Sequence, residues 1–436
     1  MPTARGRAGR ATVARHGRLR TPHPLLSLLA ILGVSALVLV ASVTGVTAFS
    51  VWNAASAVAE TAVVLDEDEA DPPSLGAIEG GVNLLLVGTD TCEGQDVALF
   101  PRCKRDDSPG ERNDVTMLVH ISDNPRRVTV VSIPRDLLVD IPTCALADGG
   151  ESRVQRGAMI NASYFTGGLA CTARTVEQLT GEQIQFAAAI RWTGVIHMSD
   201  ALGGVDVCVA GEISDGNTGL HLTEGPHTLQ GVEALQFLRI RHGIGDGSDL
   251  GRISNQQQFM SSLVRKLQSG AVLSNPQALF GLASTAMSQV TQGQLVLSSG
   301  LTNPQLMVQI AMAVKDVSYS DIVFVQYPTF YRARVGAEGS DVMPVTSAAD
   351  VLFQALRDNK ALALTGEASQ GYGVEVTGEA AEPAPTATPD AAATPDPAAT
   401  APADPATAAP AEERVELPST ISGQTAKDVT CTQPQR

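Results

Sequence analysis

The chain lacks the excess of basic residues that a nucleic-acid-binding protein needs. Its 436 residues carry a formal net charge of −16. The first twenty residues hold six arginines and no acidic residue, so the remainder is more acidic than the total indicates. Because binding to nucleic acid depends on neutralising phosphates with Lys and Arg, this composition argues against a nucleic-acid partner.

Charge is absent altogether between residues 25 and 52. As a helix, this stretch is long enough to cross a hydrocarbon core of about 30 Å. The arginines that precede it predict a cytoplasmic amino terminus by the positive-inside rule. We therefore expect a basic cytoplasmic tail at 1–24, a single transmembrane helix at 25–52 in the cell membrane, and an extracytoplasmic remainder. The alternative is a cleaved signal peptide, whose apolar region would be about half as long.

Cysteine is absent before residue 92, and none of the six cysteines shows the close pairing of a zinc site. Disulfides in an oxidising compartment explain this distribution better than metal binding. Cys92 with Cys103 and Cys144 with Cys171 each close a short insertion. Cys208 and Cys431 remain by subtraction, and a buried free thiol at Cys208 is an equally ordinary alternative.

Composition changes along the chain predict its organisation. An acidic stalk at 53–79 precedes a globular segment at 80–365, which is long enough for one large domain. Residues 366–414 are rich in Pro, Ala and Thr and are expected to form a disordered linker. The tail at 415–436 regains a few apolar residues and is a candidate to dock back on the domain.

Within the globular segment, short apolar runs alternate with helical patterns, which predicts an α/β fold with a single central sheet flanked by helices. The connection at 122–127 has the length of a hairpin, so the sheet should be mixed rather than all parallel. The expected strands are 82–87, 115–121, 128–133, 204–209, 294–297 and 322–325, and the expected helices are 170–179, 194–202, 253–267, 276–290 and 304–314.

Arginine and aspartate recur where these runs begin and end. Arg135 and Asp136 directly follow the run at 128–133, at the strand end where open α/β sheets place ligands. A guanidinium fork beside a carboxylate suits a phosphate ester held with a divalent cation. Arg135 could instead form a purely structural ion pair with Asp136 or Asp140.

A later segment repeats this chemistry. Arg239 and Arg241 are two residues apart, so an extended backbone points both to one face. Asp249, Arg252 and Gln256 share one side of a helix. Simpler readings are that Asp249 only caps this helix and that Asp90, after the first run, is only a turn residue.

Several motifs in order resemble the LytR-CpsA-Psr family of cell-envelope proteins over residues 80–268. They are Asn83-Leu84-Leu85-Leu86-Val87-Gly88-Thr89-Asp90, Arg112-Asn113-Asp114, Ile133-Pro134-Arg135-Asp136, Gln230-Gly231-Val232-Glu233-Ala234-Leu235, Arg239-Ile240-Arg241 and Asp249-Leu250-Gly251-Arg252.

The resemblance implies an extracytoplasmic LytR-CpsA-Psr-like domain with Mg²⁺-dependent phosphotransferase activity, with Mn²⁺ as an alternative metal. Such an enzyme moves a glycopolymer from a polyprenyl-pyrophosphate carrier to peptidoglycan through a phosphodiester, with the prenyl tail in an apolar tunnel. By resemblance, Asp90 and Asp114 hold the metal and Asp136 supports Arg135. The implied pyrophosphate ligands are Arg112, Arg135, Arg239, Arg241, Arg252 and Gln256, and the implied catalytic residues are Arg135, Arg239, Arg241 and Asp249.

Two other function classes fit the same residues. A polyprenyl-pyrophosphate hydrolase would use water in place of the sugar hydroxyl. A non-enzymatic envelope protein would only bind the anionic polymer.

Overall fold

The computed structural model describes residues 81–382, except 96, 105–109, 147, 270, 271, 274 and 333–340, and also 414–436, 62–65 and Leu32. The chain divides into two compact units, Met1–Ala54 and Ala55–Arg436. The expected transmembrane helix at 25–52, apart from Leu32, and most of the expected stalk at 53–79 lie outside the described residues. Within the described part of the chain, no helix is both long enough and apolar enough to span a bilayer.

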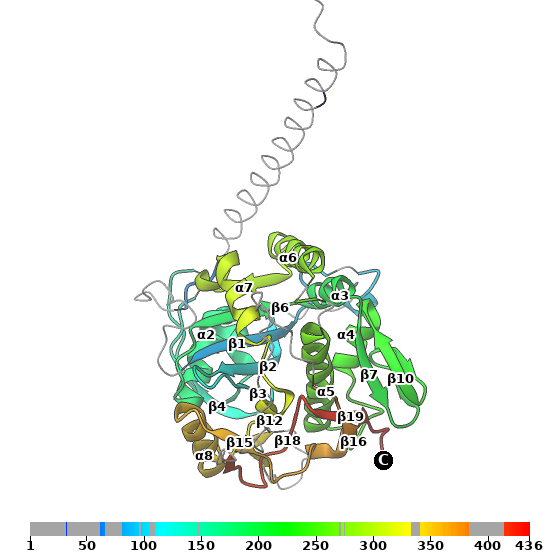
Figure 1. Ribbon diagram of the computed structural model, residues 1–436. Coiled ribbons are helices and arrows are strands. Elements are labelled where there is room, and N and C mark those ends of the chain that lie inside the picture. The colour runs from blue at the N-terminus through cyan, green and yellow to red at the C-terminus, as the bar shows by residue number, and fades with distance from the viewer. Residues whose placement is uncertain are drawn as a thin grey trace, which may run out of the picture. The chain divides into compact units, whose positions relative to one another are not determined.

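A seven-stranded sheet forms the centre of the second unit, in the order β11-β6-β1-β2-β3-β12-β18 (Figure 1). The apolar runs β1 (Val82–Asp90), β2 (Arg112–Ile121) and β3 (Val128–Ile133) pair antiparallel in sequence order. On either side of these three strands, β6 (Phe186–Ile190) runs parallel to β1 and β12 (Ile322–Gln326) runs parallel to β3. The predicted mixed sheet is therefore confirmed.

Helices cover both faces of this sheet. On one face, α2 (Ala162–Thr180) and α8 (Thr346–Arg357) enclose the largest apolar core, which contains Leu85, Leu118 and Val131. The opposite face meets α5 (Asp249–Gln268) and α7 (Pro304–Ala313), and α6 (Pro276–Thr291) packs near its edge. The sheet is thus the middle layer of an α-β-α arrangement, as the alternating pattern predicts.

A second sheet, in the order β10-β7-β19-β16, lies beside α5 and includes the run expected at 204–209, so the expectation of a single sheet is wrong (Figure 1). Its strands are β7 (Val205–Val209), β10 (Gly225–Leu229), β16 (Val374–Glu379) and β19 (Asp428–Thr432). The expected linker start at 366 is therefore wrong, because β16 belongs to the fold. Most of β16 is exposed, and its order comes from pairing with the distant β19, which local composition does not reveal.

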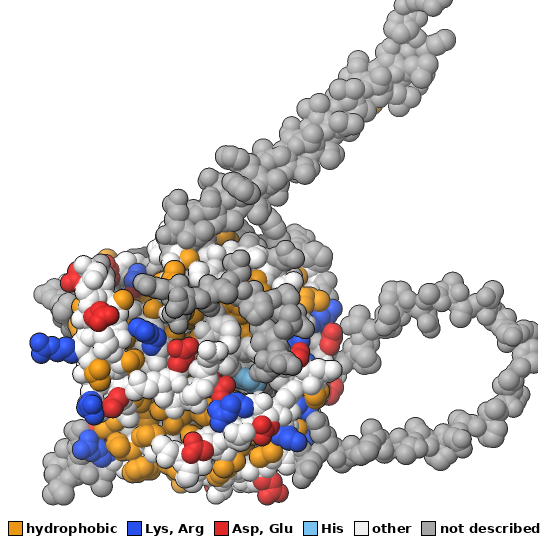
Figure 2. All heavy atoms as spheres, turned by 90° about the vertical axis from the view of Figure 1, so that its left-hand side faces the viewer, with side chains coloured by type: hydrophobic (Ala, Val, Ile, Leu, Met, Phe, Trp, Pro, Cys, Tyr) orange, Lys and Arg blue, Asp and Glu red, His pale blue; other side chains and the backbone are white. Residues whose placement is uncertain are grey.

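The remaining elements are short or lie at the edges of these layers. They are α3 (Trp192–Ala201), α4 (Gly231–Arg239), β4 (Leu138–Ile141), β5 (Gln155–Met159), β8 (Ile213–Asp215), β9 (Leu220–Leu222), β11 (Leu295–Leu297), β13 (Thr329–Tyr331), β14 (Val342–Pro344), β15 (Ala361–Ala363), β17 (Arg414–Glu416) and β18 (Gly423–Thr425). Acidic and basic side chains intermingle on the face that Figure 2 shows, and no basic patch dominates it.

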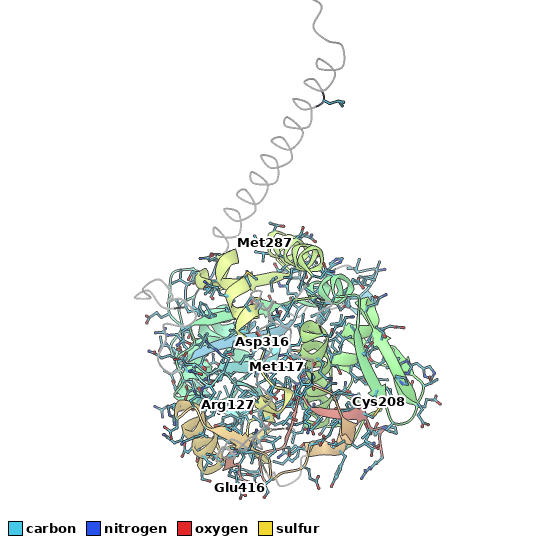
Figure 3. All side chains as sticks on the ribbon, in the orientation of Figure 1. Met117, Arg127, Cys208, Met287, Asp316 and Glu416 are labelled. Carbon is cyan, nitrogen blue, oxygen red and sulfur yellow. A yellow bond between two sulfur atoms is a disulfide. The ribbon has the colours of Figure 1, made fainter. Side chains whose placement is uncertain are left out.

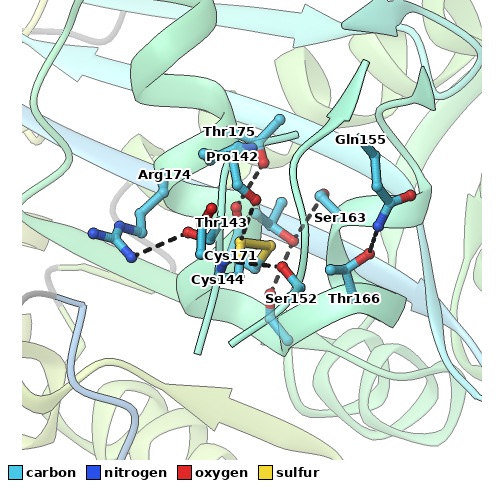
Figure 4. Close-up of a disulfide and its surroundings, with 12 residues drawn as sticks. Pro142, Thr143, Cys144, Ser152, Gln155, Ser163, Thr166, Cys171, Arg174 and Thr175 are labelled. Atoms are coloured by element: carbon cyan, nitrogen blue, oxygen red, sulfur yellow. Dashed lines mark hydrogen bonds between the residues drawn. A yellow bond between two sulfur atoms is a disulfide. The ribbon is translucent and has the colours of Figure 1, made fainter. Parts of the chain in front are cut away.

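Three disulfides fasten segments to these layers. The expected bonds Cys92–Cys103 and Cys144–Cys171 are both present, and the second ties the loop after β4 to α2 (Figure 4). Beside it, Ser152 Oγ accepts from the backbone N–H of Cys144. The third bond joins Cys208 on β7, labelled in Figure 3, to Cys431 on β19, so the alternative of a free thiol at Cys208 is wrong.

His120 on β2 makes the fold sensitive to acid. Its side chain is 3% exposed and its Nδ1 lies 2.8 Å from Asn83 Oδ1. Burial lowers the pKa of His120 to about 4, so the unfolded chain takes up a proton at a higher pH than the folded chain. The contribution of neutral His120 to the stability of the fold is therefore fully present above pH 6.5 and is lost as the pH falls toward 4.

We expect His120 alone to reduce the free energy of unfolding by about 2 kcal/mol between pH 7 and pH 5. Urea unfolding at the two pH values measures the loss. His120→Gln, which cannot gain a proton in this range, should show a smaller difference. An equal difference in both proteins would contradict the assignment.

Candidate functional site

Arg135 stands at the centre of a cluster of opposite charges. It follows β3, and its Nη1 lies 3.1 Å from each carboxylate oxygen of Asp114 on β2. Its Nε lies 3.6 Å from Asp136 Oδ1 and 3.5 Å from Asp249 Oδ1. Segments more than a hundred residues apart therefore converge on one guanidinium.

Arg252 is the second cation of this cluster. Its Nη2 lies 2.6 Å from Asp249 Oδ1 and donates to the backbone carbonyl of Asp114 at 3.0 Å. The helix places Asp249 and Arg252 on one side, as their spacing predicts. Ser248, not Asp249, caps α5, because its side chain accepts from the backbone N–H of Gly251. The simpler reading of Asp249 as the helix cap is therefore wrong.

The cluster is largely desolvated. Asp136, Asp249 and Arg252 are all below 9% exposed. Burial lowers the pKa of Arg135, but the carboxylates of Asp114, Asp249 and Asp136 outweigh it, so the pKa is raised overall. Burial is also the main reason that the pKa of Asp136 is raised. The cluster is held together by ion pairs between groups that are each costly to bury alone.

Some of the buried oxygens in this cluster accept no hydrogen bond. Among the described residues, Oδ2 of Asp249 and Oδ2 of Asp136 accept no hydrogen bond, whereas Oδ1 of Asp249 forms ion pairs with Arg252 and Arg135. Buried polar atoms in native proteins are usually satisfied by protein, water or ligand. These two oxygens are therefore open to a further donor or cation.

A β-bulge brings Asp114 into position. The pairing of β1 with β2 shifts between Gly88 and Thr89, which leaves Asp114 as the unpaired extra residue. Bulges of this kind redirect a side chain beside a functional site. One step further, Asp90 and Arg112 are opposite partners at the strand ends. The structure therefore brings Asp90, Arg112 and Asp114 to the same end of the β1–β2 pair.

The other predicted arginines approach from the α4 segment or pack on aromatic rings. Arg239 lies over the Trp192 ring at 4.2 Å, and Arg112 lies over the Phe165 ring at 5.3 Å. Arg241 donates through Nε to the backbone carbonyl of Gly247 at 3.2 Å. Arg239 and Arg241 have different partners, and these contacts do not test the expectation that both side chains point to one face.

A small cavity of about 40 Å³ joins Arg241 to the charge cluster. Asp136, Asp249 and Tyr331 share its lining with Arg241. Tyr331 was missed by sequence reasoning because β13 is far from every motif in the chain. Tyr331 is 49% exposed, and the burial of the other half of the residue is the main reason that its pKa is raised.

Gln256 lies apart from this cavity. It is 3% exposed and donates to the backbone carbonyl of Leu238 at 2.9 Å, just before Arg239. Asn255 makes the same kind of bond to Phe237, and Gln257 reaches Ser132 on β3. These contacts give the amide run on α5 a supporting position, and direct contact of Gln256 with a substrate stays a prediction. The signal for such a role was an unbroken amide run inside a helix.

An apolar face leads to the cluster along β1. Burial alternates on this strand, with Leu85 and Val87 fully buried and Leu84 and Leu86 only half-buried. Alternation puts Leu84, Leu86 and Asp90 on one face of the sheet. The neighbouring strands and α5, α6 and α7 also present half-buried apolar side chains around this face, including Val115, Val119, Ala188, Met260, Val264, Met287, Met307 and Ile310.

The metal expectation concerns Asp90 and Asp114. Among the residues that the structure describes, no group of three or more His, Cys, Asp or Glu side chains is arranged to hold a metal ion. A hard cation such as Mg²⁺ is commonly held by one or two carboxylates together with water and substrate phosphate oxygens. Two aspartates at one end of a strand pair fit that chemistry without forming an all-protein site.

The Cys92–Cys103 disulfide supports the aromatic platform under Arg239. Both half-cystines pack against the cluster of Phe100, Trp192 and Ile196. We expect Cys92→Ser with Cys103→Ser to leave a folded protein with about tenfold weaker substrate affinity, because Trp192 loses part of its support. Titration with inorganic pyrophosphate and a thermal melt measure the two effects. A large fall in melting temperature with unchanged affinity would contradict this view.

Comparison with known proteins identifies relatives of the whole site-bearing region. The model of the LytR-CpsA-Psr family matches residues 48–339. The chain is 32% identical over 234 residues to the probable cell wall biosynthesis protein LcpB of Corynebacterium glutamicum, which covers 53% of this chain and 52% of the relative. It is 26% identical over 253 residues to the polyisoprenyl-teichoic acid–peptidoglycan teichoic acid transferase TagU of Enterococcus faecalis, covering 58% and 75%.

Solved structures are more distant. The LytR-Csp2A-Psr enzyme from Actinomyces oris is 24% identical, with a TM-score of 0.46 over 66% of this chain and 94% of that one. TagV of B. subtilis is 18% identical, with a TM-score of 0.48 over 65% and 98%. The chain spans about half the length of the two Corynebacterium glutamicum relatives, LcpB and LcpA. Because the family model matches more than half of the sequence, the chain belongs to the LytR-CpsA-Psr family.

Proposed function

We propose that this protein is a membrane-anchored phosphotransferase that moves a glycopolymer from a polyprenyl-pyrophosphate carrier to peptidoglycan. The observation that carries the proposal is a desolvated cluster of two arginines and three aspartates near the end of a half-buried apolar face. A lipid-linked pyrophosphate has two matching parts. Its long apolar chain suits the apolar face, and its compact double anion suits the two arginines of the cluster. The name of the relative TagU, a teichoic acid transferase to peptidoglycan, supports this substrate class.

The apolar part of the substrate would lie along the sheet face of Leu84 and Leu86. Each buried CH₂ group contributes about 0.8 kcal/mol, so a prenyl chain gains much of its affinity from such a surface. The row on β1 ends at Asp90, which would place the first phosphate near the strand ends. An enclosed apolar tunnel stays a prediction.

The anionic part would meet Arg135 and Arg252, with Arg112, Arg239 and Arg241 as further ligands. Phosphoryl transfer requires positioning and neutralisation of charge more than covalent catalysis. A peptidoglycan hydroxyl attacks the phosphorus that bears the glycopolymer. A phosphodiester forms, the bridging P–O bond breaks, and polyprenyl phosphate leaves. The proton of the hydroxyl would pass to one of the carboxylates of the cluster.

Asp90 and Asp114 would hold a divalent cation beside the pyrophosphate. When bound, the cation neutralises charge on the phosphate oxygens. We expect Asp90→Asn to weaken binding of Mn²⁺ by at least about tenfold, because a carboxylate ligand becomes a neutral amide. Electron paramagnetic resonance of Mn²⁺ with pyrophosphate present measures this without a turnover assay. Equal Mn²⁺ affinity in Asp90→Asn, Asp114→Asn and the unmodified chain would contradict the assignment.

The proposed location in the cell rests on the uncharged segment at 25–52 and on the disulfides. Residues 25–52 would anchor the protein in the cell membrane, with the amino terminus in the cytoplasm and the catalytic unit outside. All six cysteines lie in disulfides in the described unit, which fits an oxidising compartment. The site would then lie on the side of the membrane where peptidoglycan is found.

The lipid that accompanies the protein tests the proposal. The full chain is purified in mild detergent and its bound lipids are identified by mass spectrometry. We expect a polyprenyl phosphate or pyrophosphate that is depleted in Arg135→Lys. Recovery of ordinary membrane phospholipids alone, from both proteins, would count against the proposed substrate class.

A further inference from the structure

The loop between Arg241 and Asp249 is built from closely packed glycines. Gly243, Gly245 and Gly247 all have positive φ. A Cβ atom on Gly243 would lie 2.3 Å from the backbone oxygen of Ser214, and one on Gly245 would lie 2.2 Å from that of Gly371. Residues 242–247, here called the glycine loop, therefore have one conformation that surrounding backbone enforces.

The end of the described chain forms one wall of the glycine loop. Gly245 N–H donates to Gln433 O at 3.1 Å, and Gln435 N–H donates to Gly243 O at 3.0 Å. The Gln435 side chain also accepts from Gly243 N–H at 2.9 Å. Ile244 and Pro434 form an antiparallel bridge. The glycine loop is thus paired, strand-like, with residues almost two hundred positions later.

This late segment is itself firmly attached. Cys431 is bonded to Cys208 on β7, and Ala210 N–H donates to Thr432 O. The Thr432 hydroxyl lies within hydrogen-bonding distance of the side-chain oxygens of Asn255 and Gln258 on α5. The helix that begins with Asp249 and Arg252 therefore shares its contacts with the segment that holds the glycine loop.

The glycine loop in turn orients Arg241. The carbonyl of Gly247 accepts from Arg241 Nε at 3.2 Å, and Gly247 also packs against the Gln435 side chain. Arg241 shares a small cavity with Asp136 and Asp249. A chain of direct contacts thus runs from Gln435 through Gly243 and Gly247 to the guanidinium at the charge cluster.

We propose that residues 428–436 act as a clamp that positions Arg241 for phosphate binding, with Gln435 as the positioning residue. The inference rests on the proposed function and adds a residue outside the family-matched region 48–339. The clamp is absent from every motif because it acts through the backbone of the glycine loop.

A graded series at position 435 tests the clamp in the full chain. Gln435→Ala removes the side-chain bond to Gly243, and Gln435→Pro also removes the backbone donor. Since a hydrogen bond contributes modestly to net stability, we expect affinity for inorganic pyrophosphate to fall about threefold and about tenfold, respectively. Gln433→Ala is the matched control, because Gln433 bonds the loop through its backbone carbonyl, and its affinity should not change.

Hydrogen exchange provides a readout that is independent of the substrate. The Gly243 and Gly245 amides should exchange faster in Gln435→Pro than in Gln433→Ala, while the amides of the seven-stranded sheet exchange at the same rate in both variants. Unchanged pyrophosphate affinity across the series, with binding intact in the unmodified chain, would overturn the clamp alone. If the unmodified chain fails to bind pyrophosphate, the proposed function and the clamp fall together.

Discussion

Arg135→Lys should reduce glycopolymer transfer by at least about a hundredfold while the protein stays folded. Lysine keeps the charge but has a single ammonium in place of a planar fork. In the structure, Arg135 meets both oxygens of Asp114 through Nη1 and faces Asp136 and Asp249 through Nε. A point charge cannot keep all three carboxylates in place and also bind a phosphate. Turnover with a lipid-linked donor measures the loss.

Arg127→Lys is the matched control, because Arg127 precedes the opposite end of the same strand. It is 7% exposed and donates to the backbone and side-chain oxygens of Asn359. Its replacement should lower stability slightly and leave transfer intact. If both variants lose transfer equally, the loss reflects the fold, and the central role of Arg135 is wrong.

Leu86→Trp should selectively block donors that carry a long prenyl chain. Leu86 is half-buried on the sheet face that leads to Asp90, so a larger ring there fills space that the chain would occupy. Losing the contacts of one isoprene unit corresponds to roughly 3 kcal/mol, or more than a hundredfold in affinity. The apparent KM for the long-chain donor should rise steeply, whereas kcat/KM for a short-chain analogue should change little.

Val376→Trp offers a control of the same kind on a different surface. Val376 is 51% exposed on β16, far in sequence from the apolar row. Val376→Trp should leave kcat/KM unchanged for both donors. If Leu86→Trp lowers kcat/KM equally for both donors, the ring disturbs the site itself. If kcat/KM is unchanged for both donors, the sheet face does not bind the substrate.

The central layer of the fold was predictable because its strands are continuous apolar runs. The runs at 82–87, 115–121 and 128–133 became β1, β2 and β3, and the short connection at 122–127 correctly indicated a hairpin. The helix expected at 170–179 corresponds to the second part of α2, which Gly167 and Gly168, with non-helical φ and ψ, separate by a kink from a first part that begins at Ala162. Because glycine has a low helix propensity, the spacing of apolar residues does not reveal the first part of α2.

Sequence reasoning was weaker wherever order comes from distant pairing. The composition of residues 366–414 predicts a linker, yet β16 forms within this segment by pairing with β19. The position of Arg135, Asp136 and Asp114 at strand ends predicts that these residues gather, whereas the place of Asp249 beside them follows only from the family resemblance. The approach of Tyr331 to the site and the contact of Gln435 with the glycine loop are not predictable in this way, because neither residue lies in a motif or in a periodic pattern.

Transfer of the glycopolymer to peptidoglycan can be followed directly with a defined donor. The full chain in detergent is given a synthetic polyprenyl-pyrophosphate-linked oligosaccharide, peptidoglycan fragments and Mg²⁺, and the products are followed by phosphorus NMR and mass spectrometry. We expect a new phosphodiester between oligosaccharide and peptidoglycan, formed in equal amount with polyprenyl phosphate and lost in Arg135→Lys. Release of free oligosaccharide phosphate at the same rate with and without peptidoglycan would contradict this expectation and identify the protein as a hydrolase.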